Sequence, residues 1–251
     1  MWTAAAGDDA RMRIESQVAC ERCQIAGGSG KPVQLFHRRT PRRAHDALHA
    51  GRGTGRAVEV DLGQGEFLEL GGRTVLIVGL GGIGTQVARR AYGLGMRVIA
   101  TRGSRREGPD YVEYVGLGDE ALELARQADV VINAAPLTEQ TRGFFNAAFF
   151  EAMKPTAYFV SVGRGQSTVT DDLIAALEAG KLAGAGLDVT DPEPLPQDHP
   201  LWRAPRVIIT PHTAGRSDRS RERLFLLVQE NLRRYVAGEP LYSVVDIERG
   251  Y

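Results

Sequence analysis

The sequence predicts an α/β protein built on a doubly wound parallel sheet. Short β-branched runs alternate with helical patterns from about residue 69 onward, and a glycine-rich loop joins the first run to the first helix. Polar residues directly follow several of the later runs. Strands that alternate with helices imply right-handed crossovers, which place consecutive strands parallel in one sheet.

The expected elements follow from hydrophobic spacing. Strands are expected at 74–78, 97–101, 129–133, 157–162, 185–189 and 207–210. Helices are expected at 83–92, 119–127, 146–153, 171–179 and 217–236, the last of them long and amphipathic. Thr170 is the expected N-cap of the helix at 171–179, and Gly180 is expected to end that helix.

The pattern divides the chain near residue 65. Residues 1–65 show no sustained period and are expected to form an irregular or disordered segment. Residues 66–215 are expected to form the α/β domain, and residues 216–251 a C-terminal helix and tail. The two flanking segments would together supply an incomplete or irregular second lobe.

Composition excludes several classes of protein. The formal net charge is zero, which gives no argument for nucleic acid or an anionic membrane surface as a partner. No uncharged stretch reaches the roughly 18–20 apolar residues of a membrane helix, and no secretory signal precedes the domain. With two cysteines, a disulfide framework is not expected, and the cytoplasm is the expected compartment.

A zinc site is the alternative reading of the N-terminal segment. Cys20 and Cys23 form a CxxC pair, and His45 and His49 follow. The gap between the two pairs exceeds the usual finger spacing, so no metal is expected. The basic cluster at 38–43 is expected to be a solvated run.

The glycine loop GLGGIG at 79–84 has the spacing of a dinucleotide-binding turn. Gly79 permits the tight turn, Gly81 lets the backbone approach a pyrophosphate, and Gly84 lets the helix pack on the strand. Gly82 and Ile83 open the helix, whose N-terminus attracts phosphate. A Rossmann domain that binds a nicotinamide cofactor is therefore expected.

The end of the second strand favours NADP over NAD. An acidic residue there would bind the ribose hydroxyls of NAD. The sequence instead has Arg102, Ser104 and Arg105, which are suited to a 2′-phosphate. The alternative is a solvated loop.

Three polar residues at later strand ends suit carbonyl reduction. Arg164 follows the fourth strand, Glu193 the fifth, and His212 the sixth. In an open α/β sheet, ligands bind beyond the carboxyl ends of the strands. A cation can hold a substrate carboxylate, an imidazolium can protonate a carbonyl oxygen, and a neighbouring carboxylate stabilises the imidazolium.

From about residue 70 to the tail, the chain resembles the D-isomer-specific 2-hydroxyacid dehydrogenase family. The ordered segments that carry the resemblance are GLGGIG at 79–84, PLTEQTRG at 136–143, GRG at 163–165, GAGLDV at 184–189, EPLP at 193–196, HPLW at 199–202, TPH at 210–212 and VVD at 244–246. The resemblance implies Arg164 as substrate anchor, Glu193 as partner of the histidine, and His212 as acid/base.

The resemblance also implies further cofactor contacts. Asp188 would contact the nicotinamide carboxamide, with a strand-end residue as the alternative, and Pro136 and Thr141 would line the cleft, with a strand-to-helix turn as the alternative. The remaining residues of the expected cofactor set are Val162, Gly163, His212 and Gly215.

The expected function is an NADP-preferring oxidoreductase acting on a small 2-keto or D-2-hydroxy acid such as glyoxylate or hydroxypyruvate. The resemblance implies a homodimer, and also a substrate lobe that residues 1–65 do not show. A truncated or mis-started reading frame, or a shifted frame, would account for the absence of this lobe. The alternatives are therefore a dinucleotide-binding sensor or partner-binding protein without turnover, or a truncated, inactive dehydrogenase. The apolar stripe of the last helix is expected to lose its packing partner.

Overall fold

The computed structural model of the protein describes residues 68–247. Residues 1–65, with the expected irregular segment and the zinc alternative, lie outside the described residues. Seven strands form one sheet: β1 (Thr74–Val78), β2 (Arg97–Arg102), β3 (Tyr114–Leu117), β4 (Val130–Asn133), β5 (Tyr158–Ser161), β6 (Gly184–Leu187) and β7 (Val207–Ile209). Every pair of neighbours is parallel, in the order β3-β2-β1-β4-β5-β6-β7.

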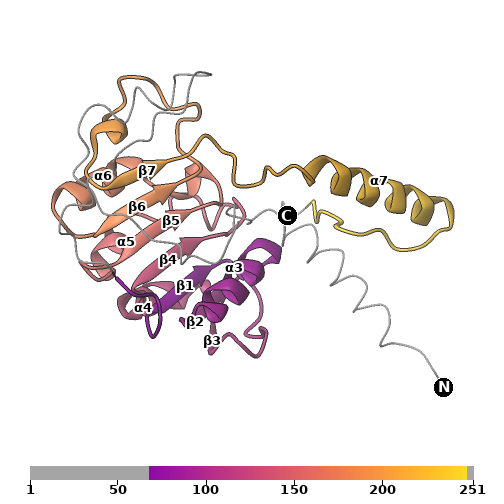
Figure 1. The fold of residues 1–251 in the computed structure, drawn as a ribbon, viewed down its shortest axis with the longest axis horizontal. Helices are drawn as coiled ribbons and strands as arrows, with labels where there is room; N and C mark the ends of the chain where they lie inside the picture. The colour runs from indigo at the N-terminus through magenta and orange to yellow at the C-terminus, as the bar shows by residue number, and fades with distance from the viewer. Residues whose placement is uncertain (1–67, 248–251) are drawn as a thin grey trace.

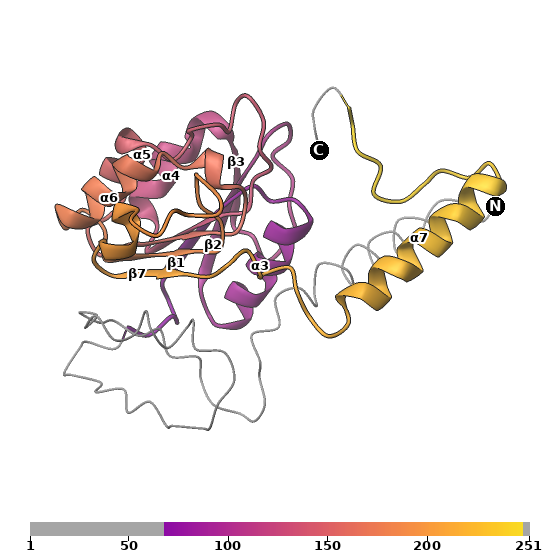
Figure 2. The ribbon, with the colours of Figure 1, turned by 90° about the horizontal axis from the view of Figure 1, so that it is seen from above.

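Helices cover both faces of the sheet (Figures 1 and 2). The covering helices are α3 (Gly82–Gly93), α4 (Ala121–Gln127), α5 (Ala147–Ala152) and α6 (Thr170–Glu178), with short 3-10 turns η2 (Gly118–Glu120), η3 (Gly165–Ser167) and η4 (Pro200–Arg203). A fifth helix, α7 (Ser220–Val236), follows β7 and does not cover the sheet. One core cluster holds buried residues of α4, α5 and α6, and the other holds those of α3. The doubly wound parallel sheet is thus confirmed.

All six expected strands are present, and one more strand, β3, was not predicted. It pairs only with β2, at the edge of the sheet. Its four residues, Tyr114–Leu117, include a glycine and are too short for a periodic signal. The order of strands reverses between β1 and β4, which is where a doubly wound sheet binds its ligand.

The predicted cap of α6 is wrong by one residue. Val169 is the N-cap, and Thr170 is already helical. The Thr170 hydroxyl donates instead to the carbonyl of Asp191, 2.9 Å away, and so ties α6 to the loop after β6. Gly180 ends the helix as expected: its φ is +69°, and its N–H donates to the Leu177 carbonyl.

Helix α7 extends away from the sheet (Figures 1 and 2). None of its residues is buried, and its exposed apolar side chains are Leu224, Phe225, Leu226, Val228, Leu232, Tyr235 and Val236. The predicted exposed stripe is therefore confirmed. Tyr242 of the tail is 8% exposed, because Asn231 hydrogen-bonds its backbone and Arg234 lies 3.7 Å above its ring. Across 68–247, no helix combines the length and hydropathy of a membrane span.

Candidate active site

The glycine loop lies at the carboxyl end of β1, where two close backbone approaches define it. A Cβ at Gly84 would lie 2.1 Å from the carbonyl oxygen of Gly79, so the first turn of α3 rests directly on the loop. Gly79 has a φ of +95°, and a Cβ there would lie 2.6 Å from the backbone of Ala135. Only glycine fits at either position.

In the middle of the loop, the backbone is open on the side where a phosphate would approach. A Cβ at Gly81 or Gly82 would meet no atom within 4 Å. Gly81 is the N-cap of α3 and has no side chain to bond the amides of the first turn. These free amides and the positive end of the helix dipole fit a pyrophosphate, so the loop suits a dinucleotide.

The end of β2 presents arginines to the same region. The Arg102 Nε donates to the carbonyl of Leu80, 2.8 Å away, which fixes the side chain beside the glycine loop. Burial and the nearby charge of Arg105 lower the pKa of Arg102, whereas Glu107 raises it. Ser104 and Arg105 are exposed. A phosphate between these two arginines would relieve their repulsion.

Arg106, the next arginine along this loop, is already paired. Its guanidinium bonds Glu120 at 2.7 Å and also the hydroxyl of Tyr114. The bond from Arg106, the N–H of Leu117 and the Tyr114 hydroxyl together lower the pKa of Glu120 to about 2. This cluster ties the loop after β2 to β3 and η2, and it leaves Arg102 and Arg105 as the cations for a ligand.

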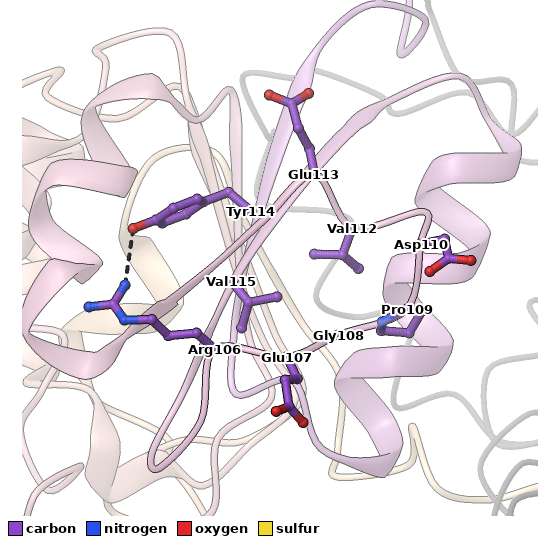
Figure 3. A pocket seen from close by; sticks show the side chains of 9 residues that line it. All are labelled: Arg106, Glu107, Gly108, Pro109, Asp110, Val112, Glu113, Tyr114 and Val115. Carbon is purple, nitrogen blue, oxygen red and sulfur yellow. Dashed lines mark hydrogen bonds between the residues drawn. The ribbon is translucent and has the colours of Figure 1, made fainter.

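A cavity of about 460 Å³ lies on the outer side of the same loop (Figure 3). Val112 and Val115 lie near its middle, and the carboxylates of Glu107, Asp110 and Glu113 lie around them. Arg106 also lines the cavity but is paired with Glu120, and Glu113 is paired with Arg97, so Glu107 and Asp110 leave an acidic lining that does not suit the anionic part of a dinucleotide.

The end of β5 carries Arg164 in an exposed position between two buried glycines. A Cβ at Gly165 would lie 1.8 Å from the carbonyl oxygen of Thr190, so this turn is wedged against the loop after β6. The Arg164 Nη1 donates to the Gly163 carbonyl at 2.9 Å. The cation thus projects from a tightly packed turn at the site edge of the sheet.

His212 and Glu193 form the pair that the sequence predicted. The His212 Nδ1 lies 2.6 Å from Glu193 Oε1, although the two side chains come from different loops. Their side chains are 48% and 40% exposed. A carboxylate on Nδ1 fixes the ring and leaves Nε2 free for proton transfer.

Asp188 anchors the loop that carries His212. The residue is 7% exposed, and its carboxylate accepts hydrogen bonds from Thr210 Oγ1 at 2.6 Å, Thr213 N at 2.9 Å and Ala214 N at 2.8 Å. Its carbonyl accepts from the N–H of His212, which has a φ of +51°. The strand-end role is thus what the geometry shows, and a contact with nicotinamide stays a prediction.

The turn after β4 also shows its alternative role. Thr141 Oγ1 donates to the Pro136 carbonyl at 2.6 Å and accepts from the N–H of Thr138 at 2.7 Å. These bonds close the turn that borders the glycine loop near Ala135. Contacts of Pro136, Thr141, Val162, Gly163 and Gly215 with a cofactor stay predictions.

One buried polar residue of this edge was not predicted. Asn133 ends β4 and is 0% exposed. An asparagine at the end of an apolar strand was the available signal.

In 68–247, no group of His, Cys, Asp and Glu side chains is arranged to hold a metal ion.

Fold and site together define a dinucleotide-binding domain of the Rossmann type, with an imidazole–carboxylate pair at its ligand edge. The family model for the NAD binding domain of D-isomer specific 2-hydroxyacid dehydrogenases matches residues 35–214. The chain belongs to this family.

Curated relatives agree with that assignment. The chain is 41% identical over 170 residues to human glyoxylate reductase/hydroxypyruvate reductase, covering 68% of this chain and 52% of the relative. It is 41% identical over 178 residues to a glyoxylate reductase of Korarchaeum cryptofilum, covering 70% and 53%. The chain therefore spans about half the length of these relatives.

Solved structures are similar over the same region. An NADPH-dependent glyoxylate/hydroxypyruvate reductase from Sinorhizobium meliloti, in complex with NADP and sulfate, matches with a TM-score of 0.67 and 33% identity, covering 83% of this chain and 64% of that one. A D-isomer specific 2-hydroxyacid dehydrogenase family protein from Aeromonas salmonicida matches with a TM-score of 0.66 and 36% identity, covering 72% and 58%.

Proposed function

We propose that this chain is an NADP-preferring oxidoreductase for a small 2-keto or D-2-hydroxy acid such as glyoxylate or hydroxypyruvate. The observation that carries the proposal is the 2.6 Å contact of His212 with Glu193 at the sheet edge that holds the glycine loop. Relatives named as glyoxylate and hydroxypyruvate reductases support the substrate class.

Each polar residue has one task in this reaction. A bound nicotinamide cofactor supplies or accepts the hydride. His212 donates a proton to the substrate oxygen during reduction and takes it back during oxidation. Glu193 orients the imidazole ring of His212 and stabilises its charged form. Arg164 binds the substrate carboxylate and stabilises the negative charge that develops on the reacting oxygen.

The preference for NADP rests on the loop after β2. Arg102, held by the Leu80 carbonyl, and Arg105 would bind the 2′-phosphate, with Ser104 as a hydroxyl donor. The Sinorhizobium structure with NADP supports this choice. Arg102→Asp should weaken NADPH binding more than NADH binding, because a carboxylate repels the phosphate and accepts ribose hydroxyls. Fluorescence titration with both cofactors measures the difference.

A second candidate function is dinucleotide binding without turnover. The exposure of His212 and Glu193, at 48% and 40%, favours it, since hydride transfer needs a site that excludes water.

One assay separates the two functions. NADPH oxidation with glyoxylate or hydroxypyruvate is followed at 340 nm for the parent chain and for His212→Ala, beside NADPH titration of both. The enzyme proposal expects turnover in the parent, a loss of about 10²–10⁴-fold in the variant, and equal cofactor affinity. Equal rates in the two proteins would refute the role of His212, and saturable binding without turnover would favour the second function.

We further propose a homodimer, which the family resemblance supports, and a cytoplasmic location, which the low cysteine count supports. Sedimentation equilibrium measures the mass of the assembly in solution. A monomer at micromolar concentration would contradict this part of the proposal.

A further inference from the structure

Asn133 carries a buried side-chain amide at the end of β4, beside the end of β5, where the loops after these two strands begin. It is the last residue of β4, in register with Val78 of β1 and with Ser161 of β5. Along β4, alternate residues share a face, so Asn133 lies on the side of the buried Val131. Apolar packing would favour an aliphatic residue at such a position.

The three polar atoms that surround this amide fix its orientation. Asn133 Oδ1 accepts from the N–H of Ala135 at 3.1 Å, and a backbone N–H can only donate. Asn133 Nδ2 then donates to Ser161 Oγ at 3.0 Å and to Ser167 Oγ at 2.8 Å. Both amide protons and the oxygen are thus used, so the side chain is held in one orientation.

One of these bonds leads directly to Arg164. The Ser167 hydroxyl donates to the carbonyl of Arg164 at 2.6 Å, so it must accept, and does accept, from Asn133. The residue before Arg164 packs closely against the same amide, since a Cβ at Gly163 would lie 2.9 Å from Asn133 Oδ1. Asn133 is therefore linked to the Arg164 carbonyl through Ser167 and packs against Gly163 on the other side.

We infer that Asn133, acting through the hydroxyl of Ser167, is the positioning residue for Arg164. This inference rests on the proposed function, in which Arg164 binds the substrate carboxylate. The same amide accepts a hydrogen bond from Ala135, which begins the turn after β4. It therefore connects the turn after β5, which carries Arg164, to the turn after β4, which borders the glycine loop. An anchor for a substrate needs this fixed distance from the cofactor edge.

Two serines provide a matched pair of variants. Ser161 and Ser167 are both buried, at 1% and 0% exposed, and both accept from the same amide. Only the Ser167 hydroxyl continues to Arg164. Ser167→Ala therefore cuts the connection, whereas Ser161→Ala removes an equivalent buried bond and leaves the connection intact.

The kinetic test compares KM and kcat for glyoxylate in the two variants. Ser167→Ala should raise KM by about tenfold or more, with NADPH affinity changed less than about twofold. Ser161→Ala should leave KM within about twofold of the parent, even with a similar loss of stability. Equal changes of KM in the two variants would overturn the inference. If Ser167→Ala does not fold, Ser167→Cys keeps the volume with a weak donor and should show the same direction.

Amide hydrogen exchange tests the connection from Asn133 through Ser167 to Arg164 without relying on turnover. Ser167→Ala should speed amide exchange in peptides spanning 163–168, and Ser161→Ala should not. If the parent chain has no turnover, the proposed function fails, but this exchange difference still decides whether the Ser167 hydroxyl, through which Asn133 acts, holds the Arg164 turn. Equal exchange rates of these peptides in the two variants would refute this connection.

Discussion

Gly84→Ala is expected to separate the helix from the glycine loop. The added Cβ would lie 2.1 Å from the carbonyl oxygen of Gly79 and 3.1 Å from Ile77 Cγ2. Carbon and oxygen in contact normally stay about 3.3 Å or more apart. The first turn of α3 must therefore move by about 1 Å, because the atom that it meets is backbone and has no alternative rotamer.

The expected cost follows from two opposing terms. Overpacking of a rigid contact costs about 3 kcal/mol or more, while alanine gains about 1 kcal/mol over glycine in a helix. The net loss of unfolding free energy is about 2 kcal/mol or more, measured by urea denaturation. NADPH affinity should fall by about tenfold or more, because the displaced amides no longer face the phosphates.

Gly93→Ala is the matched control in the same helix. A Cβ there would meet no atom within 4 Å, so only the gain in helix propensity applies. This variant should be stabilised by about 0.5–1 kcal/mol and bind NADPH like the parent. If Gly84→Ala kept the parent's stability and cofactor affinity, the close contact and the phosphate role of the loop would both be refuted.

Three further predictions test other parts of the structure. Burial disfavours the charged form of Asp129, but the Thr74 N–H and Lys154 outweigh it and hold its pKa below the usual value. Asp129→Asn should therefore lower the unfolding free energy by about 1 kcal/mol at pH 7, and this difference should vanish as pH falls from about 4 through the lower native pKa, measured by urea denaturation across pH. Glu193→Gln should lower kcat for glyoxylate reduction by about tenfold or more while NADPH affinity stays unchanged, and an unchanged kcat would contradict the pairing with the histidine. Tyr242→Ala should speed amide exchange in peptides of 231–237 while cofactor affinity stays constant, since the lost ring and hydroxyl both contact Arg234 of α7; unaltered exchange would show that the Tyr242 side chain does not hold the helix.

The sequence predicted the strands that are buried and rich in β-branched residues, such as β1, because periodicity and flanking glycines report burial. It did not predict β3, whose four residues are stabilised by pairing with β2 and by the bond of Arg106 to Tyr114. Such long-range pairing leaves no local pattern. The cap of α6 failed for a related reason: the Thr170 hydroxyl had a partner 21 residues away.

The site was predicted by residue type more successfully than by contact. His212 and Glu193 were expected together and lie together. For Asp188, a ligand contact and a loop or strand-end role were both expected; the structure shows its carboxylate bonded to Thr210, Thr213 and Ala214, partners that no spacing rule reveals, and the ligand contact stays a prediction. Asn133 was overlooked because one polar residue in an apolar run carries no information about what it bonds.

The uniform direction of the seven strands makes the two rims of the sheet unequal in what they tolerate. One rim carries the glycine loop, Arg164 and His212, and the other carries the Asp129 ion pairs beside the start of β1. Saturation mutagenesis scored for soluble yield should therefore be sensitive in the core, at Asp129, and at the closely packed glycines of the first rim such as Gly84. A screen for the proposed turnover should in addition be sensitive at the exposed side chains of Arg164 and His212. Those side chains are free to diverge, while the glycines beneath them and the second rim maintain the fold.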